Sequence, residues 1–228
     1  MAAASPGAAE AFGSTLAERL GSLQAALPPS TRLLAVSKGH PAELVRQAAA
    51  LGQRSFGESR LQEAVAKQEA LADLPNLDWH FIGRLQANKA RAVLRRFGTV
   101  HSVDSRALAE RLQRIAAEES LAPGILLQVK FRPDPAKTGF DPAEVRALGP
   151  DLARLAPLRC LGLMTIAPLG LIPGERLELF RECRALADDL GLPECSMGMS
   201  GDWREAVAAG STWVRLGSLL FGTRPIQA

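Results

Sequence analysis

One feature constrains the fold of this chain more than any other: a short apolar run followed by a helical pattern recurs about eight times. The apolar runs occupy residues 33–36, 55–57, 79–82, 99–103, 125–131, 160–166, 195–197 and 212–216. The helical patterns between them include residues 61–71, 86–97 and 175–190. Strands that alternate with helices at this spacing are typical of parallel βαβ units. About eight units in one α/β chain predict a single closed (β/α)8 TIM barrel.

A further helix is expected before the first strand. Apolar residues recur at three- and four-residue spacing from Phe12 to Leu27, and two prolines then end the pattern. The chain has 228 residues, and no linker or low-complexity segment divides it after about residue 10. We therefore expect one domain over residues 1–228, with an extra N-terminal helix and a flexible stretch over about residues 1–10.

The competing architecture is a doubly wound open sheet, which usually has fewer strands. Its dinucleotide-binding form carries the motif Gly-x-Gly-x-x-Gly, and this motif does not occur in the sequence. Neither the phosphate loop Gly-x-x-x-x-Gly-Lys nor the nucleophile elbow Gly-x-Ser-x-Gly occurs either. Nucleotide hydrolysis and α/β-hydrolase chemistry therefore lack support, and the barrel is our prediction.

Charge and composition exclude several classes of protein. The 27 basic and 24 acidic side chains are interleaved, which indicates solvated helix faces rather than a nucleic-acid surface. No apolar run approaches the ~18 residues that span a bilayer. The first ten residues contain no Lys or Arg, unlike a secretory signal. Three cysteines without C-x-x-C spacing fit reduced thiols, so we expect a cytoplasmic protein without a membrane segment.

The three histidines do not predict a metal site. His40, His80 and His101 lie far apart in the sequence and show no metal-ligand spacing. His80 falls inside a predicted strand, where a hydrogen-bonded core histidine is the expected role. We predict no bound metal.

Lys38 follows the first predicted strand, where a barrel places active-site residues. Apolar walls at that end disfavour a charge and lower the pKa of a lysine amine. A neutral amine can form a Schiff base with an aldehyde. The chain has only five lysines, which makes one at this position notable. An exposed loop lysine is the other interpretation, and position alone does not decide between the two.

Two turns of small residues follow the last two predicted strands. They are Gly198-Met199-Ser200-Gly201 and Gly217-Ser218, and each precedes a helix. Free N–H groups at helix starts favour phosphate, and barrels often bind phosphate in the loops after strands seven and eight. Ordinary helix capping is the alternative. Phosphate is our prediction because both turns fall on those two strands.

Several sequence segments together resemble a known family. They run in family order from residue 33 to residue 222 and include Leu34-Ala35-Val36-Ser37-Lys38, Phe56-Gly57-Glu58 with Gln62-Glu63, Trp79-His80-Phe81-Ile82-Gly83, Lys137-Thr138-Gly139-Phe140, Gly162-Leu163-Met164, Gly198-Met199-Ser200 and Val214-Arg215. Through these segments the sequence resembles the pyridoxal phosphate homeostasis proteins, the YggS/PROSC family.

The resemblance implies a barrel of the alanine-racemase type without that enzyme's second domain. It implies that Lys38 holds pyridoxal 5'-phosphate as a Schiff base and that Arg215 faces the pyridine nitrogen. Ser200, with the backbone of Gly217 and Ser218, would hold the phosphate. Two further cofactor contacts are expected from residues at strand ends, Met164 and Ser59. Ser59-Arg60 departs from the family, which usually shows Asn-Tyr there.

The family's role is the maintenance of intracellular pyridoxal phosphate, without established turnover. The alternative is a pyridoxal-phosphate-dependent amino-acid racemase. Racemases of this barrel type resemble one another in using a lysine on one face and a tyrosine on the other, and this chain has no tyrosine. We therefore expect a non-catalytic, monomeric cofactor-binding protein whose candidate partners are apo-enzymes that receive the cofactor.

Overall fold

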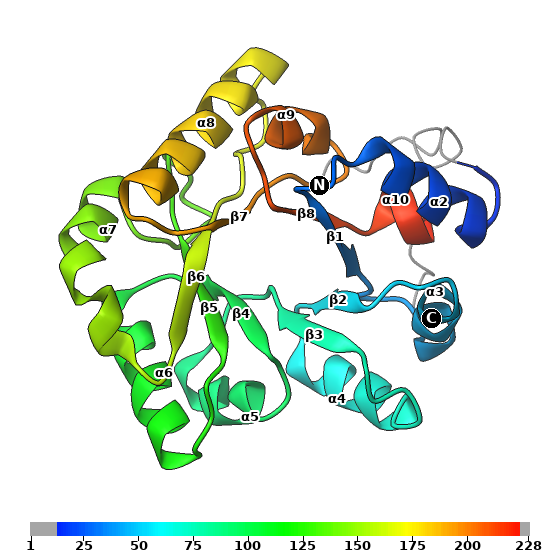
Figure 1. The fold of residues 1–228 in the computed structure, drawn as a ribbon, viewed down its shortest axis with the longest axis horizontal. Coiled ribbons are helices and arrows are strands. Elements are labelled where there is room, and N and C mark those ends of the chain that lie inside the picture. The colour runs from blue at the N-terminus through cyan, green and yellow to red at the C-terminus, as the bar shows by residue number, and fades with distance from the viewer. Residues whose placement is uncertain (1–12, 224–228) are drawn as a thin grey trace.

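The structure, a computed structural model, describes residues 13–223. Eight parallel strands form a closed barrel in chain order, and helices surround it (Figure 1). The strands are β1 (Arg32–Val36), β2 (Ser55–Glu58), β3 (Asp78–Phe81), β4 (Thr99–Val103), β5 (Gly124–Gln128), β6 (Arg159–Met164), β7 (Glu194–Ser196) and β8 (Trp213–Leu216). The predicted (β/α)8 barrel is confirmed.

The helices follow the strands as the sequence pattern requires. They are α2 (Leu16–Ala26), α3 (Ala42–Ala50), α4 (Leu61–Ala70), η1 (Ala87–Lys89), α5 (Ala90–Leu94), α6 (Arg106–Glu118), α7 (Pro142–Leu148), η2 (Gly149–Leu155), α8 (Pro173–Asp189), α9 (Trp203–Ala208) and α10 (Ser218–Phe221). The predicted N-terminal helix is α2, although Phe12 and the stretch expected to be flexible lie outside the described residues.

Local capping explains where several helices begin. Ser105 precedes α6, and its Oγ accepts the N–H of Leu108 at 3.3 Å. At the start of α7, the N–H of Asp141 donates to Oε2 of Glu144 at 2.7 Å. Each bond satisfies a polar group at a helix start that would otherwise lack a protein partner.

The strand expected over residues 160–166 ends at Met164, and two other predictions differ further from the structure. The single helix expected over residues 86–97 is a short 3-10 turn, η1, followed by α5, because the N–H groups of Lys89 and Ala90 donate to carbonyls three residues earlier. The strand expected over residues 125–131 ends at Gln128. Beyond it, the N–H of Val129 still donates to Met164 of β6 at 2.8 Å, but the N–H of Lys130 donates to the carbonyl of Phe140 at 2.9 Å, so at Lys130 the chain pairs with its own returning segment.

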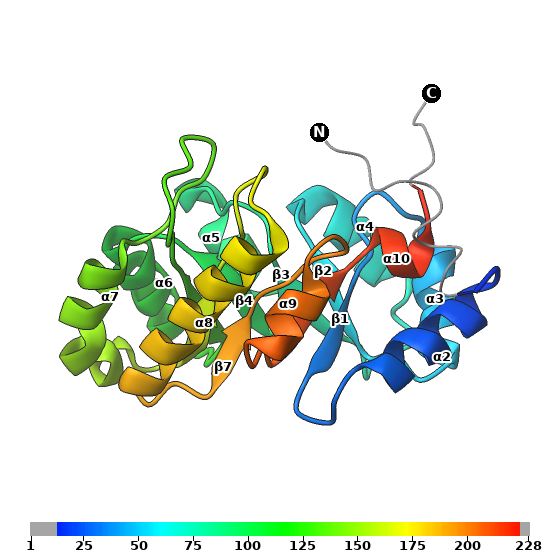
Figure 2. The same cartoon turned by 90° about the horizontal axis from the view of Figure 1, so that it is seen from above.

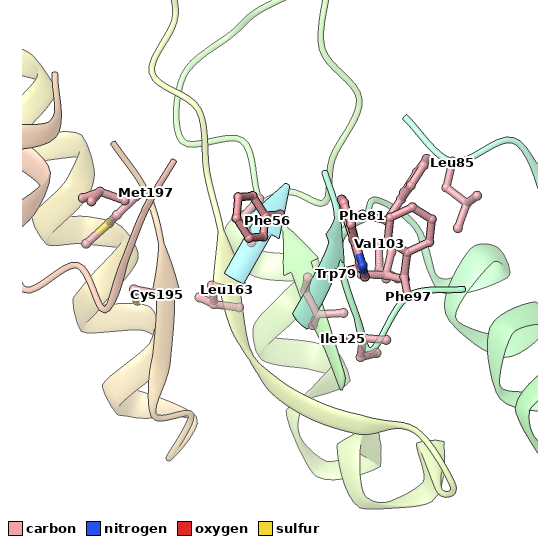
Figure 3. Close-up of a cluster of buried hydrophobic side chains, with 14 of the residues drawn as sticks. Phe56, Trp79, Phe81, Leu85, Phe97, Val103, Ile125, Leu163, Cys195 and Met197 are labelled. Atoms are coloured by element: carbon pink, nitrogen blue, oxygen red, sulfur yellow. The ribbon is translucent and has the colours of Figure 1, made fainter. Parts of the chain in front are cut away.

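The main apolar core lies between the strands and the helices. Figure 3 shows part of it, including Phe56, Trp79, Phe81 and Phe97. The rings of Phe81 and Phe97 meet edge to face with centroids 5.2 Å apart. Burial of each such side chain contributes about 1.5–3 kcal/mol. This shell fixes the strands and therefore the direction in which their ends point.

The inside of the barrel holds a second, more polar layer. His101 of β4 hydrogen-bonds Ser196 of β7 at 2.9 Å, although β5 and β6 separate the two strands in the sheet. The contact therefore crosses the barrel interior. His80 Nε2 lies 2.6 Å from Asp78 Oδ2, and His80 Nδ1 lies 2.8 Å from His101 Nε2. The prediction of a hydrogen-bonded core histidine at position 80 is confirmed.

The parallel strands all end on the same side of the molecule, where the predicted site residues lie. In Figure 2 the connections after β5 and β6 project from this side, above α7 and α8. Across residues 13–223, no helix is long and apolar enough to cross a membrane.

Candidate functional site

The barrel brings the predicted site residues to one end. Lys38 lies two residues beyond β1, Arg215 lies within β8, and these strands are neighbours with Leu34 opposite Arg215. Met164 ends β6, and the turn with Ser200 follows β7. These residues therefore come from four adjacent strands, β6, β7, β8 and β1.

Ser59 lies on the next strand around the barrel. It directly follows β2 and is half-buried. Its backbone packs closely against Gly83, since a Cβ on that glycine would lie 2.1 Å from the Ser59 carbonyl oxygen. The backbone of position 59 is thus fixed against the end of β3, whichever side chain stands there.

The two small-residue turns require their glycines. Gly198 has φ of +92°, and a Cβ there would lie 2.6 Å from the Cβ of Ala206 on α9. A Cβ on Gly217 would lie 3.0 Å from the carbonyl oxygen of Val36 in β1. Glycine therefore lets both turns approach their neighbours closely.

Backbone donors remain open at these turns. Among the described residues, no protein group accepts the N–H of Ser200, Gly201, Gly217 or Ser218. The carboxylate of Asp202 instead accepts the N–H of Met199 at 2.6 Å and so fixes the first turn. Free N–H groups on two adjacent loops suit an anion with several oxygens.

A buried ionic cluster supports the segment that carries Lys38. The ammonium group of Lys67 on α4 donates to Glu58 Oε1 at 2.6 Å, to Glu63 Oε1 at 2.7 Å and to the carbonyl of Ser37 at 2.7 Å. Ser37 Oγ also donates to Glu58 Oε1 at 2.7 Å. These bonds hold the residue just before Lys38.

The same cluster holds the residue after Lys38. The N–H of Gly39 donates to Glu63. Burial raises the pKa of Glu58, against the effect of Lys67. Burial also acts to raise the pKa of Glu63, but hydrogen bonds from Lys67 and Gly39 outweigh it and leave that pKa below its ordinary value. The backbone on both sides of Lys38 is thus held by the cluster, the Ser37 carbonyl by Lys67 and the Gly39 N–H by Glu63.

Sequence reasoning missed Lys67. Its side chain is only 6% exposed and its ammonium is paired with two carboxylates, so it does not provide a free amine. One signal was available: Glu63 and Lys67 are spaced i, i+4 on a predicted helix, the spacing of a helical ion pair. Nothing in that spacing indicates that the pair faces the barrel.

Arg215 carries a buried guanidinium. It donates to the Ser196 carbonyl at 2.6 Å, to Ser196 Oγ at 2.9 Å and to the Thr165 carbonyl at 3.0 Å. Within residues 13–223 it forms no ion pair with a carboxylate, and burial lowers its pKa to about 10. Three of its five N–H groups are used, which leaves donors for a ligand.

The residues at this end fit pyridoxal phosphate by their chemistry. They supply a primary amine on an anchored loop, open N–H groups on two turns that a larger residue would distort, and a buried donor that cannot accept a proton. The described part of the chain shows no group of three or more side chains that could hold a metal ion.

Comparison with known proteins agrees with this geometry. Residues 14–225 match the family model "Alanine racemase, N-terminal domain". The pyridoxal phosphate homeostasis protein of Synechocystis sp. is 50% identical over 206 residues, which covers 88% of this chain and 94% of that protein. The chain belongs to the pyridoxal phosphate homeostasis protein family.

A second protein of this family and a solved structure extend the match. The Pseudomonas aeruginosa protein is 45% identical over 205 residues, which covers 88% of each chain. PipY of Synechococcus elongatus, solved with PLP bound, is 53% identical with a TM-score of 0.88 and covers 91% of this chain and 100% of its own. The structure of PipY without PLP has a TM-score of 0.89.

Proposed function

We propose that this chain binds pyridoxal 5'-phosphate at the carboxyl end of its barrel and takes part in intracellular pyridoxal phosphate homeostasis. The observation that carries the proposal is the match with PipY, whose structure holds PLP and covers 91% of this chain. The donor set described above supports it independently, because it offers a partner for each polar end of the cofactor.

Lys38 would attach the cofactor covalently. When bound, pyridoxal phosphate supplies an aldehyde that reacts reversibly with a primary amine. The cluster around Lys67 holds the Ser37 carbonyl and the Gly39 N–H, so the loop that presents the Lys38 amine has little freedom. Fixed geometry of this kind lowers the entropic cost of binding.

The two turns would hold the phosphate. The N–H groups of Gly217 and Ser218 and the hydroxyl of Ser200 are the expected donors, with the N–H of Gly201 beside them. Backbone donors of this kind need no rearrangement when the anion arrives, because the barrel already fixes the turns.

Arg215 would face the pyridine nitrogen, with Met164 and Ser59 completing the site. A guanidinium can only donate, so its partner nitrogen must accept and stay unprotonated. A neutral ring is a weaker electron sink than a pyridinium, which disfavours proton removal from a bound amino acid. The chain also has no tyrosine to act as a second base.

A non-catalytic carrier is therefore the role we propose. The recipients would be apo-enzymes that require the cofactor, and the chain would act as a monomer in the cytoplasm. Cys160, Cys183 and Cys195 are all free, in keeping with a reducing compartment.

Titration of the apo-protein with pyridoxal phosphate and with pyridoxal tests the proposal. A hydrogen bond to a charged group is worth ~1.5–3 kcal/mol, so Ser200→Ala should weaken pyridoxal phosphate binding roughly ten- to hundredfold. The same substitution should leave the weak binding of pyridoxal unchanged. Equal affinity of the wild type for the two compounds would contradict the phosphate site.

A further inference from the structure

A continuous chain of hydrogen bonds crosses the barrel interior from Arg215 to Asp78. Arg215 donates to Ser196 Oγ at 2.9 Å, and Ser196 Oγ lies 2.9 Å from His101 Nδ1. His101 Nε2 lies 2.8 Å from His80 Nδ1, and His80 Nε2 lies 2.6 Å from Asp78 Oδ2. Four of these residues are almost fully buried, whereas the Asp78 side chain is 49% exposed.

The donor and acceptor in each hydrogen bond of this series follow from Arg215, its first member. Arg215 cannot accept a hydrogen bond, so Ser196 Oγ must accept from it. The Ser196 hydroxyl is fully buried, and the described residues offer it one acceptor, His101 Nδ1. His101 therefore carries its proton on Nε2 and donates to His80 Nδ1. His80 in turn carries its proton on Nε2 and donates to Asp78.

The electrostatic surroundings agree with this direction. Burial, with the neighbouring charges of Arg215 and Arg32, holds the pKa of His101 well below its usual range, so the ring is neutral. Burial acts to raise the pKa of Asp78, but the hydrogen bonds from His80 and Ser55 and the charge of Arg32 outweigh it, and the pKa is lowered. The series of hydrogen bonds thus begins at the Arg215 cation and ends at the Asp78 carboxylate.

We propose that Ser196, His101 and His80 form a one-way donor relay that positions the Arg215 guanidinium and couples its charge to Asp78 on the far side of the barrel. They are positioning residues, since none of them is part of the proposed cofactor site. The relay would keep Arg215 in a single donor-only arrangement. The effect of the relay on the cofactor ring rests on the proposed function. The order of donors and acceptors within the relay does not.

Other charged groups also lie close to this series of hydrogen bonds. Asp202 acts on Arg215 from the loop after β7 and favours its charged form. Arg32 stacks on Trp213 with its guanidinium carbon 4.0 Å from the ring centroid, and the Trp213 ring lies 5.0 Å from that of His80. These groups are common to the wild type and the variants below, so they do not confound the comparison.

Nitrogen NMR of histidine-labelled apo-protein tests the direction without any cofactor. The chain has only three histidines, so the ring signals can be assigned with His80→Gln and His101→Gln. We expect His80 and His101 to be neutral with the proton on Nε2 near neutral pH. A proton on Nδ1 of either ring, or a charged ring, would overturn the relay whether or not the chain binds pyridoxal phosphate.

Ser196→Ala tests the coupling to the site. The variant retains the bonds from Arg215 to two backbone carbonyls but removes the link to His101. Ser211→Ala is the matched control, because Ser211 is also buried but its hydroxyl has only backbone carbonyls within donating distance, those of Cys195, Met197 and Trp213. In the apo-protein, Ser196→Ala should give His101 a mixture of ring tautomers, and Ser211→Ala should not.

The Ser196→Ala and Ser211→Ala variants are then compared with each other while pyridoxal phosphate is bound to both. Ser196→Ala should shift the titration midpoint of the cofactor absorbance by roughly half a pH unit, about threefold in proton affinity. Ser211→Ala should leave it within error of the wild type. Identical shifts in both variants, or none in Ser196→Ala, would overturn the coupling. A wild type that shows no cofactor absorbance would instead count against the proposed function.

Discussion

Lys67 carries a charge into a region that water hardly reaches. Its partner Glu58 is fully buried, and Glu58 Oε2 has no hydrogen-bond partner among the described groups. A buried ion pair adds little net stability, but loss of one partner leaves an uncompensated charge. At the residue scale, the cluster beside Lys38 is therefore sensitive to single substitutions.

Lys67→Met should lower the free energy of unfolding by ~3–5 kcal/mol, because it leaves Glu58 buried without its cation. Urea denaturation measures the change. Lys89→Met, at an exposed lysine of η1, is the control and should change the free energy by less than about 0.5 kcal/mol. A loss in Lys67→Met as small as in the control would contradict the role of the cluster.

The pKa of Glu58 also predicts a pH dependence. Burial raises this pKa above the ordinary 4.5. An acid with a raised folded pKa contributes its full stability below the unfolded pKa and loses it as pH rises through the folded pKa. Relative to Glu58→Gln, the wild type should therefore lose stability as the pH rises above the ordinary pKa of 4.5. A constant difference in urea denaturation as the pH rises would contradict the raised pKa.

At the scale of elements, the turn between β7 and α9 depends on one glycine and tolerates change at another. Gly198 combines φ of +92° with a Cβ position 2.6 Å from Ala206, whereas a Cβ on Gly201 would meet no atom within 4 Å. The two positions lie in the same turn. Substitutions at the two positions therefore distinguish the effect of a changed turn shape from the effect of an added side chain.

Gly198→Ala should cost about 1–3 kcal/mol of folding stability, through the strained φ and the clash with α9. It should also weaken pyridoxal phosphate binding roughly tenfold or more, because the phosphate donors shift. Gly201→Ala retains its N–H and should leave both quantities close to the wild type. Thermal unfolding and cofactor titration of the two variants check this, and equal effects would contradict the proposed role of the turn.

The elements differ in how well the sequence predicts them. Lys38, Gly198 and Gly217 could be placed from the sequence because parallel topology brings all strand ends to one face. The split of residues 86–97 into η1 and α5 could not, since it depends on N–H groups that donate to the third preceding carbonyl and not to the fourth. Lys67 and the contact of His101 with Ser196 were also missed, because they depend on packing across the barrel rather than on neighbours in sequence.

At the scale of the whole molecule, the absence of tyrosine bears on function. The sequence contains none, so no tyrosine can deliver a proton to the face opposite Lys38. Arg215 would in addition leave the cofactor ring uncharged. Under the proposed function, both features would favour retention of the cofactor over chemistry on amino acids.

Deuterium exchange at the α-carbon of several amino acids tests this role. We expect the wild type to exchange far more slowly than an ordinary enzyme, which turns over at roughly 1–1,000 per second. Arg215→Glu, which could stabilise a charged ring, should change the cofactor spectrum without efficient racemisation. Exchange or racemisation by the wild type at enzymatic rates would favour the racemase alternative.

The account depends most on Lys38, and one measurement addresses it directly. Borohydride reduction of the protein with pyridoxal phosphate bound, followed by peptide mass spectrometry, identifies the lysine that carries the cofactor. We predict a pyridoxyl group on Lys38, and none in Lys38→Ala even where phosphate-anchored cofactor remains. A pyridoxyl group on Lys67, Lys89, Lys130 or Lys137 instead, or none on any lysine, would contradict the account.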